Sequence, residues 1–239
     1  MVGKKKNKQN KPDLATAKFE RYLSFKIRFI EAIQLARLRN EMRAMCKPVK
    51  GGHDCTEHLV HTIQAALYTW VAGLNDLDHR SVSVFRLWKE FFESDSATMK
   101  KLKEAEGEVE GGLNLIRSFR NSHGAHADRF DVLLGKHRAL QANQSLLEKS
   151  ISYFLVICEA LVRQEVVIFP DFETRLEVFI RRHGLNDAFR CVARSNPTVR
   201  DATDVARSSS PYPYPAFDIM PINVMGKKMA LLRIKKPEK

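Results

Sequence analysis

The chain has 239 residues, of which 44% are hydrophobic and 28% are charged, and its formal net charge is +12. This length and apolar content suffice for one large or two small domains whose core needs neither disulfides nor metals. No apolar run approaches the roughly 18 residues of a membrane-spanning helix, and the lysine-rich start lacks the hydrophobic stretch of a signal peptide. With its scattered cysteines, the sequence predicts a cytoplasmic protein without membrane attachment.

Apolar residues recur at helical spacing along most of the chain. In chain order the predicted helices span 14–46, 56–77, 83–92, 97–120, 138–163, 172–183 and 185–194. In the first helix the predicted inward face continues through Leu38, Met42 and Met45. In the fourth, Gly107, Gly111 and Gly112 indicate either a close approach of another helix or a break near Gly111.

The predicted fold class is all-α, because strands and helices do not alternate along the sequence. We expect an antiparallel bundle of four main helices, with short extra C-terminal helices and basic tails. The predicted organisation is a disordered basic tail at 1–13, a helical bundle at 14–165, additional short helices at 166–207, and a proline-rich linker with a basic C-terminal segment at 208–239. The apolar part of that last segment predicts a short strand or a docking segment.

Positive charge is concentrated at the two ends of the chain. Residues 1–12 carry five lysines and no acid, and residues 226–239 carry six basic residues and one glutamate, which leaves +2 for the rest of the net +12. Such ends suit a polyanion such as RNA, or they only keep the protein soluble. The candidate RNA-binding residues in these tails are Lys4, Lys5, Lys6, Lys227 and Lys228.

An arginine interrupts an apolar helical stripe in the middle of the chain. Leu102, Val109, Leu113 and Ile116 share one helical face, and the next position of that face is Arg120. A guanidinium cannot lose its charge and is almost never buried without a partner, and its planar fork matches phosphate oxygens. Histidines follow within a few residues and can transfer protons near neutral pH. The pattern therefore indicates phosphate chemistry.

These residues also carry a family resemblance. Arg120, Asn121, four intervening residues and His126 resemble the arginine–polar–x4–6–histidine signature of HEPN domains. The resemblance is closest to the abortive-infection type, in which an Ala-His-x-Asp ending is common, because residues 125–128 read Ala-His-Ala-Asp. Residues 73–76 read Gly-Leu-Asn-Asp, similar to an Arg-Leu-x-Asp that closes an earlier helix in those proteins, with Gly73 replacing the arginine.

The resemblance implies a metal-independent endoribonuclease whose motifs meet across the two-fold axis of a homodimer. RNA supplies its own nucleophile, so His126 would accept the proton of the 2′-hydroxyl and Arg120 would stabilise the charge on phosphorus. Asn121 would orient the phosphate or the loop. Possible supporting residues are Asp128, which would hold His126 in one tautomer, His123 as a rival histidine, and Asp76 as a polar residue from the earlier helix. No cofactor is expected.

Two simpler interpretations stay open. Arg120 would then only pair with an acid or compensate the negative end of a helix, and His126 would be an ordinary loop histidine. Similarly, the cluster of His53, Cys55, His58 and His61 has the residue types of a zinc site but no spacing with a defined geometry, so no metal is predicted.

The function that we expect is therefore RNA cleavage by a toxin or an antiphage, abortive-infection effector. The alternative is a non-catalytic HEPN module that binds RNA or a protein, or the toxin-like half of a toxin–antitoxin pair. The expected partners are RNA, a second copy of the chain, and an antitoxin or regulatory protein.

Overall fold

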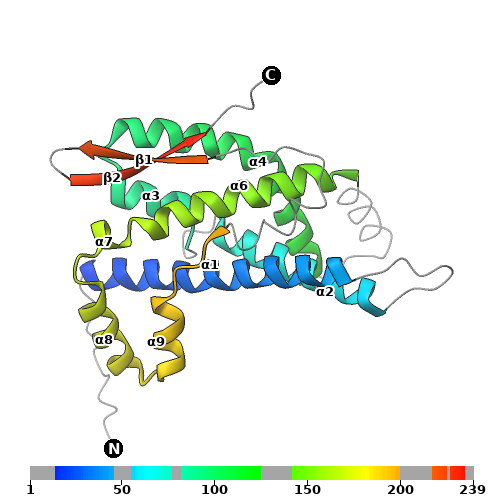
Figure 1. The fold of residues 1–239 in the computed structure, drawn as a ribbon, viewed down its shortest axis with the longest axis horizontal. Coiled ribbons are helices and arrows are strands. Elements are labelled where there is room, and N and C mark those ends of the chain that lie inside the picture. The colour runs from blue at the N-terminus through cyan, green and yellow to red at the C-terminus, as the bar shows by residue number, and fades with distance from the viewer. Residues whose placement is uncertain are drawn as a thin grey trace, which may run out of the picture.

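The computed structural model describes residues 14–45, 55–76, 82–124, 142–199, 217–224 and 227–234, and most of these residues are helical, as predicted (Figure 1). The predicted basic tail at 1–13 lies outside these ranges. In chain order the elements are α1 (Leu14–Met45), α2 (Cys55–Leu74), α3 (Val84–Phe92), α4 (Ser96–Gly124), α6 (Gln144–Arg163), α7 (Glu165–Ile168), α8 (Phe172–His183), α9 (Asp187–Arg194), β1 (Phe217–Val224) and β2 (Lys227–Ile234).

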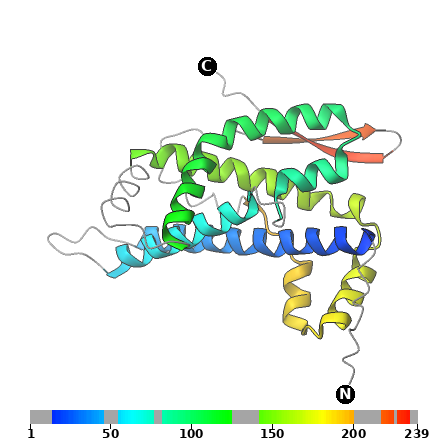
Figure 2. The ribbon, with the colours of Figure 1, turned by 180° about the vertical axis from the view of Figure 1, so that it is seen from behind.

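The long helices α1, α2, α4 and α6 enclose the hydrophobic core. Helix α1 packs against α2 and α6, helix α4 packs against the same two helices, and α3 contacts α4 and α6. Figures 1 and 2 show α6 running alongside α1, with the first part of α4 above α6. Aromatic side chains fill the space between them, and Tyr22, Phe25, Phe29 and Phe154 are fully buried. Burial of this apolar surface is the main force that holds the helices together.

Helix α4 is continuous through Gly107, Gly111 and Gly112, the glycines for which the sequence allowed a break near Gly111. Gly107 and Gly111 are exposed, whereas Gly112 is buried against α6. A Cβ atom added to Gly112 would overlap the Cβ and Oγ atoms of Ser150, while nothing lies within 4 Å of one added to Gly111. Gly112 therefore permits the close approach of α4 and α6, and the alternative of a helix break is wrong.

Alanine substitutions at the two adjacent glycines should have opposite effects. We expect Gly112→Ala to lower the free energy of unfolding by about 1–3 kcal/mol, because the added methyl group overpacks the helix contact. Gly111→Ala should raise it by up to about 1 kcal/mol, because alanine favours the helix and meets no neighbour. Urea unfolding followed by circular dichroism measures both. In Gly112→Ala, the further change Ser150→Gly should restore stability, and a Gly112→Ala protein as stable as Gly111→Ala would contradict the close approach.

The inward face of the last third of α1 differs from the prediction. Leu38 was expected to point inward, but it is 43% exposed, whereas Arg39 and Asn40 are only 6% and 5% exposed. The Arg39 guanidinium donates to Asn40 Oδ1 through Nε and one terminal nitrogen, at 3.2 and 3.0 Å. The predicted inward face is therefore wrong at Leu38, whereas Met42 is half-buried and the side chain of Met45 is not described.

A buried ion pair joins α1 to α7. Lys26 is completely buried, and its Nζ lies 2.7 Å from Glu165 Oε2, which also accepts a hydrogen bond from the Tyr22 hydroxyl at 3.0 Å. The Lys26 Nζ also lies 4.8 Å from the centroid of the Phe172 ring. Burial lowers the pKa of Lys26, although the hydrogen bond and the charge of Glu165 oppose this effect. The short helices after residue 165 are therefore fixed to the same core as the bundle.

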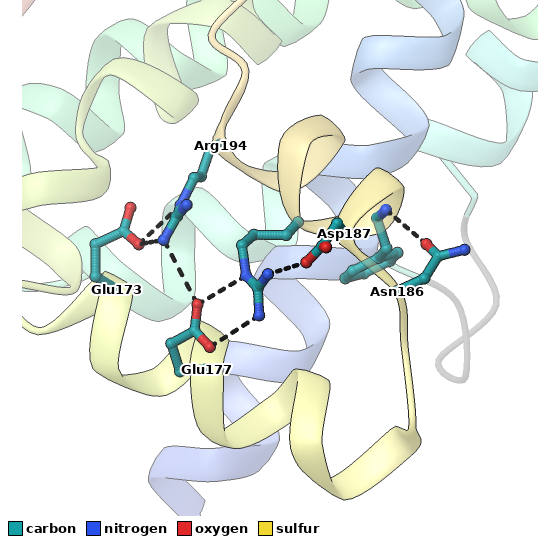
Figure 3. Close-up of polar contacts among 7 residues, drawn as sticks. Glu173, Glu177, Asn186, Asp187 and Arg194 are labelled. Atoms are coloured by element: carbon teal, nitrogen blue, oxygen red, sulfur yellow. Dashed lines mark hydrogen bonds and ion pairs between the residues drawn. The ribbon is translucent and has the colours of Figure 1, made fainter.

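Helices α8 and α9 form a pair beside the first part of α1 (Figures 1 and 2). Gly184 ends α8 in the left-handed region, with φ of 62°, and the Asn186 side chain caps α9 by accepting from Phe189 N at 3.1 Å. Figure 3 shows the polar contacts between the two helices, in which Arg190 Nε lies 2.9 Å from Glu177 Oε1 and Arg194 Nε lies 2.9 Å from Glu173 Oε2. Charged contacts therefore join the two helices, together with the stacked rings of Phe179 and Phe189, whose centroids lie 6.0 Å apart.

The C-terminal segment forms a two-stranded antiparallel hairpin. Phe217 pairs with Ile234 at one end of the hairpin, and Val224 pairs with Lys227 at the other. Strand β2 contacts α6. The hairpin agrees with the strand alternative and adds a small β element to a helical chain. Two tail lysines, Lys227 and Lys228, begin β2, while Lys4, Lys5 and Lys6 lie outside the described residues.

Candidate active site at the end of helix α4

The candidate site is centred on Arg120, which follows the buried stripe of α4 and reaches the surface of the protein. The stripe residues before it are at most 7% exposed, namely Leu102, Val109, Leu113 and Ile116. The Arg120 side chain is 27% exposed, and one of its terminal nitrogens, Nη1, lies 2.9 Å from Asp76 Oδ2. Asp76 is 24% exposed. The pair therefore lies at the boundary between the core and solvent, where a ligand can reach it.

Asp76 is positioned by the end of α2. Helix α2 ends at the fully buried Leu74, and the next residue, Asn75, is also buried. The Asn75 backbone donates from N to Ala72 O at 3.2 Å and forms an antiparallel bridge with Ser83. These backbone contacts fix the chain immediately before Asp76. The Asp76 carboxylate can therefore orient Arg120 across 44 positions of sequence.

The guanidinium of Arg120 retains donors that a ligand can use. Its Nε and Nη2 each donate to Asn121 Oδ1 at 3.3 Å, and its Nη1 donates to Asp76. An arginine has five N–H donors, so within the described residues two of them have no protein acceptor. Asp76 and Asn121 thus set the direction of the fork while part of it stays available to an anion such as a phosphate.

A polar and aromatic network supports this end of the bundle. The Phe119 ring lies edge-on to Tyr68 with centroids 5.6 Å apart, and the Tyr68 hydroxyl accepts a hydrogen bond from Gln64. Arg43 donates to Gln64 Oε1 at 2.8 Å and to Glu148 Oε1 at 2.7 Å, which connects α1, α2 and α6. Burial raises the pKa of the Tyr68 hydroxyl. Burial also acts to raise the pKa of Glu148, but the hydrogen bond and charge of Arg43 outweigh it and the pKa is lowered.

The structure brings three of the predicted site residues together, because Arg120 contacts both Asn121 and Asp76. His126 and Asp128 lie outside the described residues. The convergence of Arg120 and His126 therefore stays a prediction.

The backbone of His123 belongs to the last turn of α4, but its side chain is not described. The expected loop after Arg120 is wrong for residues 121–124, because α4 continues to Gly124. The start of any loop that carries His126 is therefore later than the sequence predicted.

Two other candidate features do not add to this site. A pocket of about 220 Å³ lies between α1 and α8, but the charged groups at its edge pair with each other, Arg175 with Asp171 at 2.8 Å and Arg182 with Glu20 at 3.2 Å. The cluster of His53, Cys55, His58 and His61 has no described side chain. Among the side chains that are described, no group of three histidines, cysteines or acids could hold a metal ion.

Cysteine 158 is a core residue, as its position on an apolar stripe predicts. It is completely buried in α6, and burial raises the pKa of its thiol well above the ordinary value. A thiol in this state packs as a small hydrophobic side chain, and we assign it no chemical role.

The sequence did not single out Tyr68, Gln64 and Arg43, which form the network that packs against Phe119, the neighbour of Arg120. Each lies on a helix that was predicted, but a pattern within one helix does not reveal its contacts with another.

In the described ranges no helix has the length and apolar character needed to cross a bilayer. Comparison of the chain with protein-family models, with curated proteins and with solved structures finds no match.

Proposed function

We propose that the protein is a metal-independent endoribonuclease of the HEPN type that acts as a toxin or defence effector. In this proposal α1, α2, α4 and α6 form the antiparallel HEPN bundle, and two copies of the chain bring their α4 ends together. The observation that carries the proposal is the orientation of Arg120. Asp76 and Asn121 hold its guanidinium at the edge of the core, with donors left for a phosphate.

The chemistry needs an acid, a base and a stabilised phosphate. The 2′-oxygen of RNA attacks the adjacent phosphorus while His126 of one copy accepts the 2′-proton. Arg120 stabilises the added negative charge on the phosphate oxygens. The bond from phosphorus to the 5′-oxygen breaks, and His126 of the second copy supplies the proton to that oxygen. The products are a 2′,3′-cyclic phosphate and a 5′-hydroxyl, and the reaction consumes no cofactor.

The test is RNA cleavage by the purified full-length chain in EDTA. We expect cleavage of a single-stranded RNA to products with 2′,3′-cyclic phosphate ends, and no cleavage of the same strand with 2′-deoxyribose. EDTA excludes contaminating metal-dependent nucleases, and the matched DNA strand tests whether cleavage needs the 2′-hydroxyl as its nucleophile. Products with a 3′-hydroxyl, or cleavage that EDTA abolishes, would contradict the proposal.

A second candidate function is favoured by the ion pair itself. Arg120 already has a carboxylate partner in Asp76, as expected if this arginine only stabilises the end of α4. The protein would then be a non-catalytic module that binds RNA or an antitoxin-like protein through its basic ends. RNA binding that decreases steeply with salt, without cleavage, would support this alternative.

A further inference from the structure

A second arginine, from helix α1, lies against the last turn of α2, shortly before the chain reaches Asp76. Gly73 in the last turn of α2 has no side chain, and a Cβ atom added there would lie 3.8 Å from Nη1 of Arg28 in α1. This is ordinary van der Waals contact. The guanidinium of Arg28 therefore lies against the space where residue 73 would otherwise extend its side chain.

Among the described residues, Arg28 differs from other arginines of α1 because it has no charged partner there. Arg21 pairs with Glu90, and Arg43 pairs with Glu148. Arg28 is partly buried, yet within the described part of the chain it makes no hydrogen bond and no ion pair. A charged group held in a partly buried place without a counter-charge keeps its full hydrogen-bonding capacity for a ligand.

The position of Gly73 brings this free guanidinium towards the candidate active site. Asp76 follows Gly73 by three residues, just after α2 ends at Leu74, and Asp76 binds Arg120. Of the described residues in this group, Arg28, Arg120 and Asp76 together carry one net positive charge. That charge matches the single negative charge of one phosphodiester, and a planar fork on each side of the phosphate suits its oxygens.

We propose that Arg28 and Arg120 together bind one phosphodiester of single-stranded RNA, with Asp76 between them as the group that orients Arg120. This inference rests on the proposed function and adds a phosphate-binding residue from α1 to it. Arg28 is a positioning residue for the RNA strand, and the proton transfers do not involve it. A merely structural Arg28, compensating the negative end of α2, would affect stability and leave RNA affinity unchanged.

The test compares the affinity of Arg28→Gln and Arg37→Gln for RNA. The probe is a fluorescein-labelled, single-stranded 20-mer with 2′-O-methyl groups throughout, which the proposed reaction cannot cleave, and the readout is fluorescence anisotropy with the full-length chain. Arg37 is the control because it lies on the same helix, its side chain is 62% exposed, and among the described residues it pairs with Glu41 four residues later. The two variants lose the same charge, so net charge alone cannot separate them.

We expect Arg28→Gln to weaken binding about tenfold, the loss typical of one charge-assisted contact. We also expect the slope of log affinity against log salt to decrease by about 0.7, the value for one phosphate contact on a single strand. Arg37→Gln should bind as the unmodified chain does. Arg28→Lys keeps the charge but loses the planar guanidinium, so its affinity for the RNA should lie between those of Arg28→Gln and the unmodified chain.

A second variant, in α2 rather than α1, tests the same contact without changing Arg28. Gly73→Leu would extend a side chain into the place of the Arg28 guanidinium and should weaken binding similarly, with both variants checked by thermal unfolding. Equal affinities for Arg28→Gln and Arg37→Gln, or no binding of the 20-mer by the unmodified chain, would overturn the inference. If binding depends on Arg28 but unmodified RNA is not cleaved, only the proposed nuclease activity is contradicted. If RNA is cleaved but Arg28→Gln binds it with unchanged affinity, only the phosphate-binding role of Arg28 is contradicted.

Discussion

Alanine at His126 or at Arg120 should nearly abolish RNA cleavage. A positioned general base contributes about 10²–10⁴-fold to a rate, and a group that stabilises developing charge contributes about 10²–10³-fold, so each single substitution should lower kcat by at least 10². Arg120→Ala also removes the ion pair between Arg120 and Asp76. Single-turnover cleavage of a labelled RNA measures the rate, and growth inhibition on expression should disappear in parallel.

Matched substitutions outside the site provide the controls. Arg37→Ala removes an exposed arginine of α1, and His183→Ala removes the last residue of α8, whose ring lies 4.4 Å from that of Phe179. Both should cleave RNA at the unmodified rate. Asp76→Asn keeps the size of the side chain but loses its charge, so cleavage should fall by less than in Arg120→Ala. Retained cleavage by purified and folded Arg120→Ala and His126→Ala proteins would contradict the proposed ribonuclease mechanism.

Periodicity within single helices was the part of the fold that the sequence predicted well. The stripe in α4 from Leu102 to Ile116 is buried, and the arginine that follows it emerges at the surface. Such a pattern depends only on which side of one helix avoids water, so it can be read without knowledge of the partner. For this reason Arg120 was recognised from sequence alone.

Contacts between helices were predictable only in part. Asp76 was named from a resemblance, and its contact with Arg120 spans 44 positions that no local pattern connects. The end of α1 shows the limit of the apolar rule, because Leu38 is exposed while Arg39 is buried beside Asn40. A buried polar group is stable where its partners satisfy it, and those partners are known only once the helices are packed.

The largest effect on stability is expected at the buried pair of Lys26 and Glu165. Replacing one partner leaves the other buried without its counter-charge, so Glu165→Leu and Lys26→Met should each lower the free energy of unfolding by about 3–5 kcal/mol. The double substitution removes both charges and keeps the volume, so its cost should be much smaller than the sum of the two. Urea unfolding monitored by circular dichroism gives the stability of the unmodified chain, the two single variants and the double variant, which together form a double-mutant cycle. Glu41→Leu, which breaks the exposed pair with Arg37, should cost less than about 1 kcal/mol. If the losses at Lys26 and Glu165 were additive, or no larger than that of Glu41→Leu, the pair would not be what fixes α7 to α1.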